Sequence, residues 1–290
     1  MSGKYRSSTG ALTEEKIREF LREDLGYGDI TSNALVDVGA RARARLFFKE
    51  NGVAAGLEEA AAILTHLDCS VETLAADGAR VPSGETLLEA EGTARALLAG
   101  ERTILNVVGR MAGIATTVAD IVDRVKRVDP DIRIAATRKT VPGLRDLDKR
   151  AVELGGGDTH RFRLDDCVLI KDNHLNFGLS ITEAVKRARE RVSFTKKIEV
   201  EVRTPGEAEE AARAGVDIVM FDNMTPREIR EALTDLEGKG LREGILYEAS
   251  GGLTPKNVEE YAATGVDVAS MGCLTHSVRN LNVKLEIEGV

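Results

Sequence analysis

Hydrophobic and polar residues in the first 115 positions follow two different periods. Apolar residues recur with helical spacing over 13–22 and 56–67, which predicts two helices, and they alternate with polar residues over 41–49, which predicts a strand with one face in solvent. Two more strand-like pieces lie between residues 70 and 90, separated by turn-forming residues. Strands and helices mixed in this way predict a small α+β domain.

A long apolar pattern with helical spacing covers residues 93–128. Gly109 and Gly113 lie inside it, and because glycine weakens the interior of a helix we expect an interruption near them. The chain contains no uninterrupted apolar run of roughly 18 residues, and its first ten residues lack the apolar core of a signal peptide. We therefore expect a protein with no membrane-spanning part.

Beyond Pro130 the pattern changes to short apolar strands that alternate with helices. The sequence predicts strands at 132–136, 168–170, 198–202, 218–221, 245–249 and 266–269, and helices at 182–191, 207–214, 227–236 and 256–263. This order is typical of βα units around a parallel sheet. A complete eight-stranded barrel takes about 250 residues. Six strands in this shorter stretch therefore predict an incomplete, open barrel.

The predicted domain boundary follows from this change of pattern. We expect residues 1–115 to form the N-terminal domain and residues 116–277 to form the open barrel. The C-terminal stretch 282–287 alternates again between apolar and polar residues, which predicts a strand. We expect the segment 278–290 to return to the sheet of the N-terminal domain.

Composition narrows the classes of partner. The net charge is −8 at pH 7, and the chain has no tryptophan and only 4% aromatic residues. A broadly basic surface and stacking platforms for bases, both typical of nucleic-acid binding, are therefore not expected. Three cysteines without a CxxC pair argue against a zinc site or a disulfide scaffold and favour the reducing cytoplasm. An anionic ligand would have to be held by a local basic cluster.

Reactive side chains lie at the ends of all six predicted barrel strands, and the carboxyl ends of the strands are where α/β barrels build their active sites. In chain order they are Thr137, Arg138 and Lys139, then Lys171, then Glu199 and Glu201 within the third strand, then Asp222, then Ser250, Gly251 and Gly252, and finally Gly272 and His276. A solvated rim could carry a few such residues by chance. Six strand ends in succession predict one converging site.

The chemistry of these residues predicts an anionic ligand with more than one charged group. Five cationic side chains would form a pocket for carboxylates and phosphates, namely Arg138, Lys139, His160, Arg161 and Lys171. Glu201 and Asp222 are hard oxygen donors that suit Mg²⁺ held jointly with substrate phosphates. An alternative for Glu201 is a buried ion pair with one of the lysines.

Two glycine-containing loops on the last two strands predict a phosphate site, because backbone amides in such loops can surround a phosphate. The first is Ser250-Gly251-Gly252, which precedes a predicted helix, and the second contains Gly272. The site therefore suits a terminal phosphate, a metal-bound polyphosphate and separate carboxylates. Phosphoribosyl diphosphate as donor and an aromatic acid as acceptor meet all three requirements.

Eight segments spread over nearly the whole chain match a known family. They are EDLGYGDITS (23–32), GERTILN (100–106), TRKTVPGLR (137–145), GGGDTHRFRLDDCVLIKDNH (155–174), EVEV (199–202), FDN (221–223), EASGG (248–252) and MGCLTHS (271–277). In these motifs the chain resembles the quinolinate phosphoribosyltransferases. The resemblance implies an N-terminal α/β sandwich and an open α/β barrel, the type II phosphoribosyltransferase fold. It also implies that quinolinate and phosphoribosyl diphosphate become nicotinate mononucleotide, pyrophosphate and CO₂ in NAD biosynthesis.

The resemblance further implies roles for individual residues and a homodimer or larger homo-oligomer. Quinolinate carboxylates would be bound by Arg102 of the neighbouring subunit with Arg138, His160 and Arg161, and Thr137 would be a further substrate contact. The catalytic residues would be Lys139 and Lys171, between quinolinate and the donor, and Glu201 and Asp222, which hold Mg²⁺ and ribose. The 5′-phosphate would be held by Ser250, Gly251, Gly252, Gly272 and His276. The chain has Thr159 where the family usually has Asn.

Two other functions remain open from the residues alone. A barrel strand that ends in Lys171 is also found in aldolases that form a Schiff base, although such a site does not need this many arginines. A non-catalytic protein that binds phosphosugars would keep Gly251, Gly252 and Gly272 but would tolerate the loss of Glu201. The paired basic residues favour quinolinate, which has two carboxylates, over nicotinate, which has one.

Overall fold

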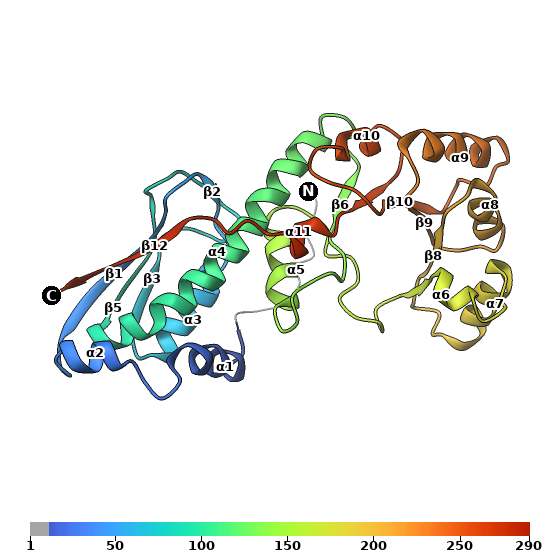
Figure 1. Ribbon diagram of the computed structural model, residues 1–290. Helices are drawn as coiled ribbons and strands as arrows, with labels where there is room; N and C mark the ends of the chain where they lie inside the picture. Colours follow the sequence, from blue (N-terminus) through green and yellow to red (C-terminus); the bar gives the residue numbers. More distant parts are fainter. Residues whose placement is uncertain (1–11) are drawn as a thin grey trace. The chain divides into compact units, whose positions relative to one another are not determined.

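The computed structural model describes residues 12–290 and divides them into two compact units (Figure 1). The first unit contains the described residues up to Ala119 together with Asp146–Gly156 and Val278–Val290, and the second contains Asp120–Arg145 and Gly157–Ser277. The domain boundary predicted between residues 115 and 116 stays a prediction. The first ten residues, for which no signal peptide is expected, lie outside the described residues.

The first unit is built on a four-stranded antiparallel sheet in the order β12-β1-β5-β3. Its strands are β1 (Arg41–Phe48), β3 (Ser70–Thr73), β5 (Thr86–Thr93) and β12 (Val283–Gly289), and β2 (Gly52–Val53) and β4 (Arg80–Val81) form a separate short pair. The register of β12 on β1 runs from Ala42 opposite Gly289 to Phe48 opposite Val283. The predicted return of the C-terminal strand to this sheet is therefore confirmed.

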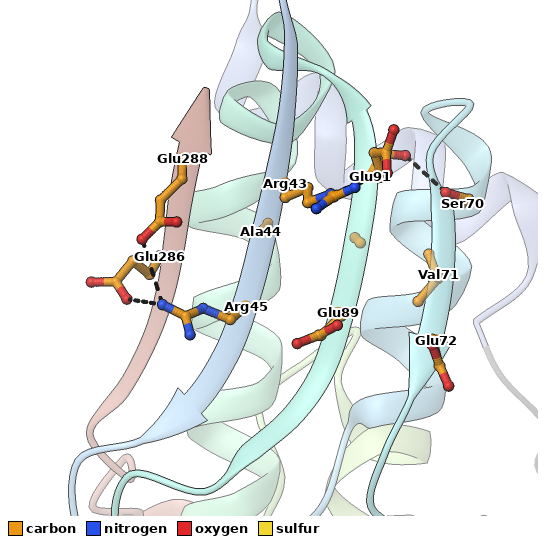
Figure 2. Close-up of a pocket in the computed structure, with 11 residues that line it drawn as sticks. Arg43, Ala44, Arg45, Ser70, Val71, Glu72, Glu89, Glu91, Glu286 and Glu288 are labelled. Atoms are coloured by element: carbon orange, nitrogen blue, oxygen red, sulfur yellow. Dashed lines mark hydrogen bonds and ion pairs between the residues drawn. The ribbon is translucent and has the colours of Figure 1, made fainter. Parts of the chain in front are cut away.

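One face of β1 lies in solvent, as its alternation predicts. Arg41, Arg43 and Arg45 are exposed, and the residues between them are buried. Figure 2 shows Arg43 paired with Glu91, and Arg45 paired with Glu286 and Glu288 on the neighbouring strand. The shallow cavity of about 590 Å³ on this face is lined by more carboxylates than guanidiniums. Such a surface does not attract a nucleic-acid backbone.

Three helices supply buried residues to the core of this sheet, namely α1 (Glu14–Leu25), α3 (Leu57–His66) and α4 (Ala94–Val125), the last of which continues into the second unit. The unit also contains α2 (Ile30–Leu35) and α5 (Arg145–Leu154). The core includes Leu46, Phe48, Leu64 and Leu88, all fully buried. The sequence did not predict α5, because its buried face is charged. Within it, Asp148 is fully buried and accepts two hydrogen bonds from the Arg110 guanidinium, at 2.7 and 2.8 Å.

The interruption expected near Gly109 and Gly113 is wrong, because α4 is continuous from Ala94 to Val125. Both glycines instead make room for another segment. A Cβ added at Gly113 would lie 2.2 Å from the carbonyl oxygen of Arg279, and one at Gly109 would lie 3.3 Å from that of Leu281. The chain that leads into β12 thus crosses α4 at two of its glycines, Gly109 and Gly113.

Helix α4 also bears on the membrane prediction. By length and composition alone this helix could span a membrane, although it contains no uninterrupted apolar run of roughly 18 residues. In the structure, 67% of its most apolar 18-residue window is buried inside the protein. Burial of this kind is what the core helix of a soluble protein shows.

The second unit contains a six-stranded parallel sheet in the order β6-β11-β10-β9-β8-β7. Its strands are β6 (Arg133–Ala135), β7 (Val168–Ile170), β8 (Ile198–Val202), β9 (Ile218–Asp222), β10 (Leu246–Ser250) and β11 (Val268–Ser270). A single parallel bridge between Ala135 and Asp158 extends the β6 edge, and β7 forms the other edge. The two edges are not paired with each other within the described residues, so the predicted open barrel is confirmed.

The helices of the second unit follow its strands closely. They are α6 (Asp172–Leu175), α7 (Ile181–Arg191), α8 (Pro205–Arg213), α9 (Pro226–Gly238), α10 (Val258–Ala262) and α11 (Cys273–His276). Thr204 and Thr225 begin α8 and α9 with capping boxes, each followed by a proline in the first turn. The sequence did not predict the single turns α6 and α11. Helix α6 begins at Asp172, after Lys171 and the end of β7, and α11 begins at Cys273, a short loop after β11 ends at Ser270. These early helix starts hold the strand-end residues close to the sheet.

We predict that Gly113→Ala lowers the free energy of unfolding by about 1–3 kcal/mol, because a Cβ at this position would clash with the backbone carbonyl of Arg279. Gly238→Ala is the matched control, since Gly238 lies in α9 with no atom within 4 Å of the added Cβ. It should be neutral or stabilising by up to about 1 kcal/mol. Urea unfolding of both variants measures the difference, and equal stabilities would contradict the tight crossing.

Candidate active site

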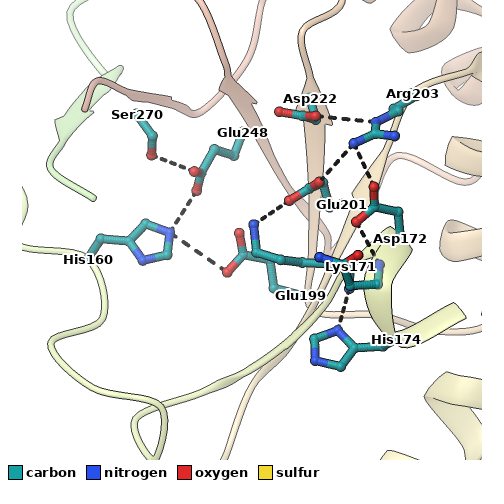
Figure 3. Close-up of polar contacts among 11 residues, drawn as sticks. His160, Lys171, Asp172, His174, Glu199, Glu201, Arg203, Asp222, Glu248 and Ser270 are labelled. Carbon is teal, nitrogen blue, oxygen red and sulfur yellow. Dashed lines mark hydrogen bonds and ion pairs between the residues drawn. The ribbon is translucent and has the colours of Figure 1, made fainter. Parts of the chain in front are cut away.

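Charged side chains meet at the carboxyl ends of β7, β8 and β9 (Figure 3). Lys171 Nζ lies 2.5 Å from Glu201 Oε2. Arg203 lies 2.9 Å from Asp172, 3.3 Å from Asp222 and 3.8 Å from Glu201. The buried ion pair considered for Glu201 is therefore present. Because Glu201 and Asp222 also end adjacent strands, this pairing leaves their oxygens grouped for a metal ion or for hydroxyl groups.

A second group of residues, around Arg138, is strongly cationic. Burial lowers the pKa of Arg138, and the positive charges of Arg161 and Arg145 lower it further. Within the described chain the buried Nε of Arg138 has no hydrogen-bond partner. Arg145 donates to Thr140 Oγ1 and to the carbonyl of Phe162, both at 3.1 Å, which ties the loop after β6 to the loop that carries Arg161. An anion with more than one negative charge would satisfy this group.

Lys139 lies beside the loop after β11. The Thr275 hydroxyl donates to the Lys139 carbonyl at 2.8 Å, and the Lys139 amide donates to Thr137 Oγ1 at 3.1 Å. A Cβ at Gly272 would lie 2.9 Å from Lys139 Cδ and 3.1 Å from His276 Cδ2. Gly272 thus allows the loops after the first and last barrel strands to approach each other.

The glycine loop after β10 interlocks with the loop after β9. Gly251 and Gly252 both have positive φ, at 83° and 68°, and Asn223 is itself left-handed, with φ of 57°. A Cβ at Gly251 would lie 2.5 Å from Asn223 Oδ1 and 2.8 Å from its amide nitrogen. The Asn223 amide donates to the Ser250 carbonyl at 2.9 Å. The helix predicted at 256–263 is observed as α10, several residues beyond Gly252, so the loop itself rather than a helix end would have to surround a phosphate.

His160 is placed differently from the other predicted cations. Its imidazole is directed into the barrel, where Nε2 lies 3.1 Å from Glu248 Oε2 and 3.7 Å from Glu199 Oε2 (Figure 3). Glu248 also accepts a hydrogen bond from the Ser270 hydroxyl. The cluster lines a cavity of about 450 Å³ that reaches Ile218, Leu246 and Val268, and these are the first residues of their strands. The cationic pocket predicted from the sequence therefore does not include a free His160 side chain.

The proton on His160 can be placed from its hydrogen bonds. The Arg161 amide donates to Nδ1 at 2.7 Å, so Nε2 carries the ring proton and donates it to Glu248. Burial would lower the pKa of His160, whereas Glu199 and Glu248 raise it, and burial in turn raises the pKa of Glu199. These groups titrate as one coupled cluster, and the amide at Nδ1 leaves the imidazole no room for a second proton.

Comparison with known proteins identifies the family. Two family models, the N-terminal and C-terminal domains of quinolinate phosphoribosyl transferase, match residues 29–112 and 114–286. The chain is 50% identical over 274 residues to the probable nicotinate-nucleotide pyrophosphorylase (carboxylating) of Methanothermobacter thermautotrophicus, covering 94% of this chain and 98% of the relative. The chain belongs to the quinolinate phosphoribosyltransferase family.

Two further matches cover almost the same length. The probable nicotinate-nucleotide pyrophosphorylase (carboxylating) of Methanocaldococcus jannaschii is 45% identical over 273 residues, which are 93% of this chain and 95% of the relative. The crystal structure of NadC from Streptococcus pyogenes has a TM-score of 0.89 at 36% identity and covers 96% of this chain and 99% of that chain. Family membership therefore rests on both domains and on the fold.

The family residues predicted from the sequence form several sets in the structure, including the group around Arg138 and the glycine loop after β10. Lys171, Glu201 and Asp222 meet at one end of the sheet, and Lys139, Gly272 and His276 meet beside it. Arg102 belongs to the first unit, where it lines a separate cavity of about 400 Å³ with Lys49, Glu101 and Asn282. The second unit therefore gathers every predicted site residue except Arg102, which lies in the other unit.

The sequence did not single out three residues that contact these sets. Arg203 follows the EVEV motif directly, Arg145 ends TRKTVPGLR, and Glu248 begins EASGG. Their positions beside or within the motifs could have indicated that they belong to the site. Their partners lie on other strands and loops, however, and a local sequence pattern does not predict such contacts.

Proposed function

We propose that this chain transfers the phosphoribosyl group of phosphoribosyl diphosphate to quinolinate, with decarboxylation, as a step of NAD biosynthesis. The observation that carries the proposal is the cationic group of Arg138, Arg145 and Arg161, in which the buried Arg138 Nε has no hydrogen-bond partner among residues 12–290. Quinolinate, with two adjacent carboxylates, supplies the charge that this group requires. Membership of the family and the strand-end carboxylates support the same reaction.

The reaction proceeds by positioning and by electrostatic stabilisation. Arginines of this group hold the two carboxylates, and the ring nitrogen attacks the anomeric carbon of ribose as pyrophosphate leaves. Glu201 and Asp222 stabilise positive charge at that carbon, and Lys139 and Lys171 neutralise the leaving diphosphate. The quaternised nitrogen then stabilises the carbanion formed as CO₂ is lost. Ser250, Gly251, Gly252, Gly272 and His276 hold the 5′-phosphate, and Thr137 makes a further substrate contact.

Mg²⁺ is the cofactor that these residues fit. Glu201 and Asp222 are oxygen donors on neighbouring strands, and both are largely buried with part of their surface accessible. When bound, the ion neutralises charge on the diphosphate. In the free protein Lys171 and Arg203 hold these carboxylates, so metal binding has to shift the guanidinium of Arg203.

We further propose that the protein works in the cytoplasm as a homodimer or a larger homo-oligomer with Arg102 acting in trans. Arg102 lies on α4 in a cavity of its own unit, where no barrel residue lines the surface. A cation in such a cavity can complete the site of a neighbouring copy. The reducing cytoplasm suits the three free cysteines.

Lys171 acts as a cation rather than as a Schiff-base nucleophile. A nucleophilic lysine needs a neutral amine with a free lone pair. In the structure Lys171 Nζ lies 2.5 Å from Glu201 Oε2, so the amine is engaged by a carboxylate rather than left free to attack a carbonyl. This contact disfavours the aldolase alternative.

We expect quinolinate to be turned over with release of CO₂, and nicotinate to be used about a hundredfold less efficiently. The reason is that nicotinate would leave at least one arginine of the group without its charged partner. Chromatography of the nucleotide product and trapping of labelled CO₂, with phosphoribosyl diphosphate and Mg²⁺, measure both reactions. Equal or better use of nicotinate would refute the assignment to quinolinate.

We expect Glu201→Gln and Asp222→Asn to weaken binding of Mn²⁺, used as a probe for Mg²⁺, and to abolish most activity. Arg203→Gln should instead tighten Mn²⁺ binding by about two- to fivefold, because it removes a competing cation. Electron paramagnetic resonance of free Mn²⁺, with and without phosphoribosyl diphosphate, reports this directly. Arg227→Gln, which breaks a surface pair with Glu231, is the matched control. Unchanged Mn²⁺ affinity in all three site variants would show that these carboxylates bind no metal.

We expect Arg102→Ala and Lys171→Ala to be inactive alone and to regain activity when their subunits are exchanged. Random dimers would restore about a quarter of the sites, since one site of each heterodimer contains both original residues. Native mass spectrometry confirms the exchange, and a turnover assay measures recovery. Absence of recovery in proven heterodimers would mean that Arg102 serves its own subunit.

A further inference from the structure

The carboxylate of Glu248 lies at the centre of a chain of hydrogen bonds that has no role in the reaction proposed above. Glu248 is on β10, and only 1% of its surface is exposed. One of its oxygens accepts from the Ser270 hydroxyl on β11, and the other accepts from His160 Nε2 at 3.1 Å (Figure 3). Both oxygens are therefore committed, to two segments that are far apart in the sequence.

The backbone at His160 depends on the same contacts. His160 has a φ of 51°, a left-handed conformation that is unfavourable for a residue other than glycine. Its amide donates to Asp158 Oδ1, and the Arg161 amide donates to its Nδ1, both at 2.7 Å. With Nε2 held by Glu248, the ring is fixed at both nitrogens. The imidazole thus connects the barrel interior to the backbone of Arg161.

A metal ion is the first alternative for this cluster, because the ligand atoms of His160, Glu199 and Glu248 lie within 4.8 Å of one another. Both oxygens of Glu199 also lack a hydrogen-bond partner within the described residues. The tautomer argues against a metal. A histidine that binds a metal through one nitrogen donates a hydrogen bond from the other. Here Nδ1 accepts one, so Nε2 carries a proton and has no lone pair for an ion.

We propose that Glu248 is a positioning residue for substrate binding, which holds the imidazole of His160 and through it the backbone that presents Arg161 to quinolinate. The proposal rests on the proposed function, in which Arg161 binds a carboxylate of quinolinate. Glu248 acts through the geometry of its two hydrogen bonds rather than through its charge. A displacement of about 1 Å in such a group is enough to lower catalytic efficiency strongly.

Two substitutions at Glu248 separate geometry from charge. In Glu248→Gln the amide oxygen can still accept from His160 and the amide nitrogen can donate to Ser270, so KM for quinolinate should stay within about threefold of wild type. Glu248→Asp keeps the charge but is shorter by one methylene, so KM for quinolinate should rise about tenfold with little change in KM for phosphoribosyl diphosphate. Ser270→Ala should cause a smaller rise in the same direction.

Tyr247→Phe is the matched control for a loss of stability alone. Tyr247 neighbours Glu248 on the same strand, and its hydroxyl donates to the Leu241 carbonyl at 3.1 Å, outside the cluster. This variant should lower the melting temperature without changing KM for quinolinate. A Glu248→Asp variant that behaves like the control, or a Glu248→Gln variant that loses as much as Glu248→Asp, would overturn the proposal.

Nitrogen-15 NMR of the imidazoles tests the proposal without turnover, and the chain has only four histidines. At pH 7 we expect His160 in the Nε2–H tautomer in wild type and in Glu248→Gln, and a mixture of tautomers in Glu248→Asp. Added Zn²⁺ should leave the His160 signals unchanged, and a shift at Nε2 would overturn the proposal in favour of a metal site. If wild type does not use quinolinate, the proposed function fails, whereas the tautomers still report whether Glu248 holds His160.

Discussion

Parallel pairing of six strands is the constraint on which the whole candidate site depends. Since all six strands run in the same direction, the residues that follow them are brought to one end of the sheet. The register places Ser250 opposite Asp222 and Val202 opposite Phe221. A shift of one residue in β8 would turn Glu201 away from Lys171 and out of the site. Backbone hydrogen bonds therefore determine which side chains can meet.

Charge is distributed unevenly among the side chains at this end of the sheet. The carboxylates of Glu201 and Asp222 have cationic partners in Lys171 and Arg203, and Arg203 also pairs with Asp172, so most of the negative charge in that part of the site is compensated. The group around Arg138 retains excess positive charge. In a partly buried site an unpaired charge is costly, and a ligand that supplies the missing charge is bound correspondingly well. This difference supports the proposal that one site holds a dianionic acid beside a metal-bound diphosphate.

Glu199 and Glu201 illustrate how position along one strand determines chemistry. They share a face of β8 and are separated by a single residue. Glu201 lies at the end where Lys171 and Arg203 can reach it, whereas Glu199 is fully buried beside His160 and Glu248. Burial raises the pKa of Glu199 above its ordinary value. The same residue type thus forms an ion pair at one position and lies buried beside a histidine and a second carboxylate at the other.

The sequence by itself determined the parallel strands, the open barrel, the return of the C-terminal strand and the reactive residues at the strand ends. These features follow from hydrophobic periodicity and from motifs, and both are local properties of the chain. Tertiary structure alone decided that α4 passes Gly113 without interruption, that the charged helix α5 is buried, and that Arg203 lies against Asp222. It also decided that His160 is directed towards Glu248. Local periodicity reports which residues are buried, but the partner of each residue depends on packing between segments that are distant in the sequence.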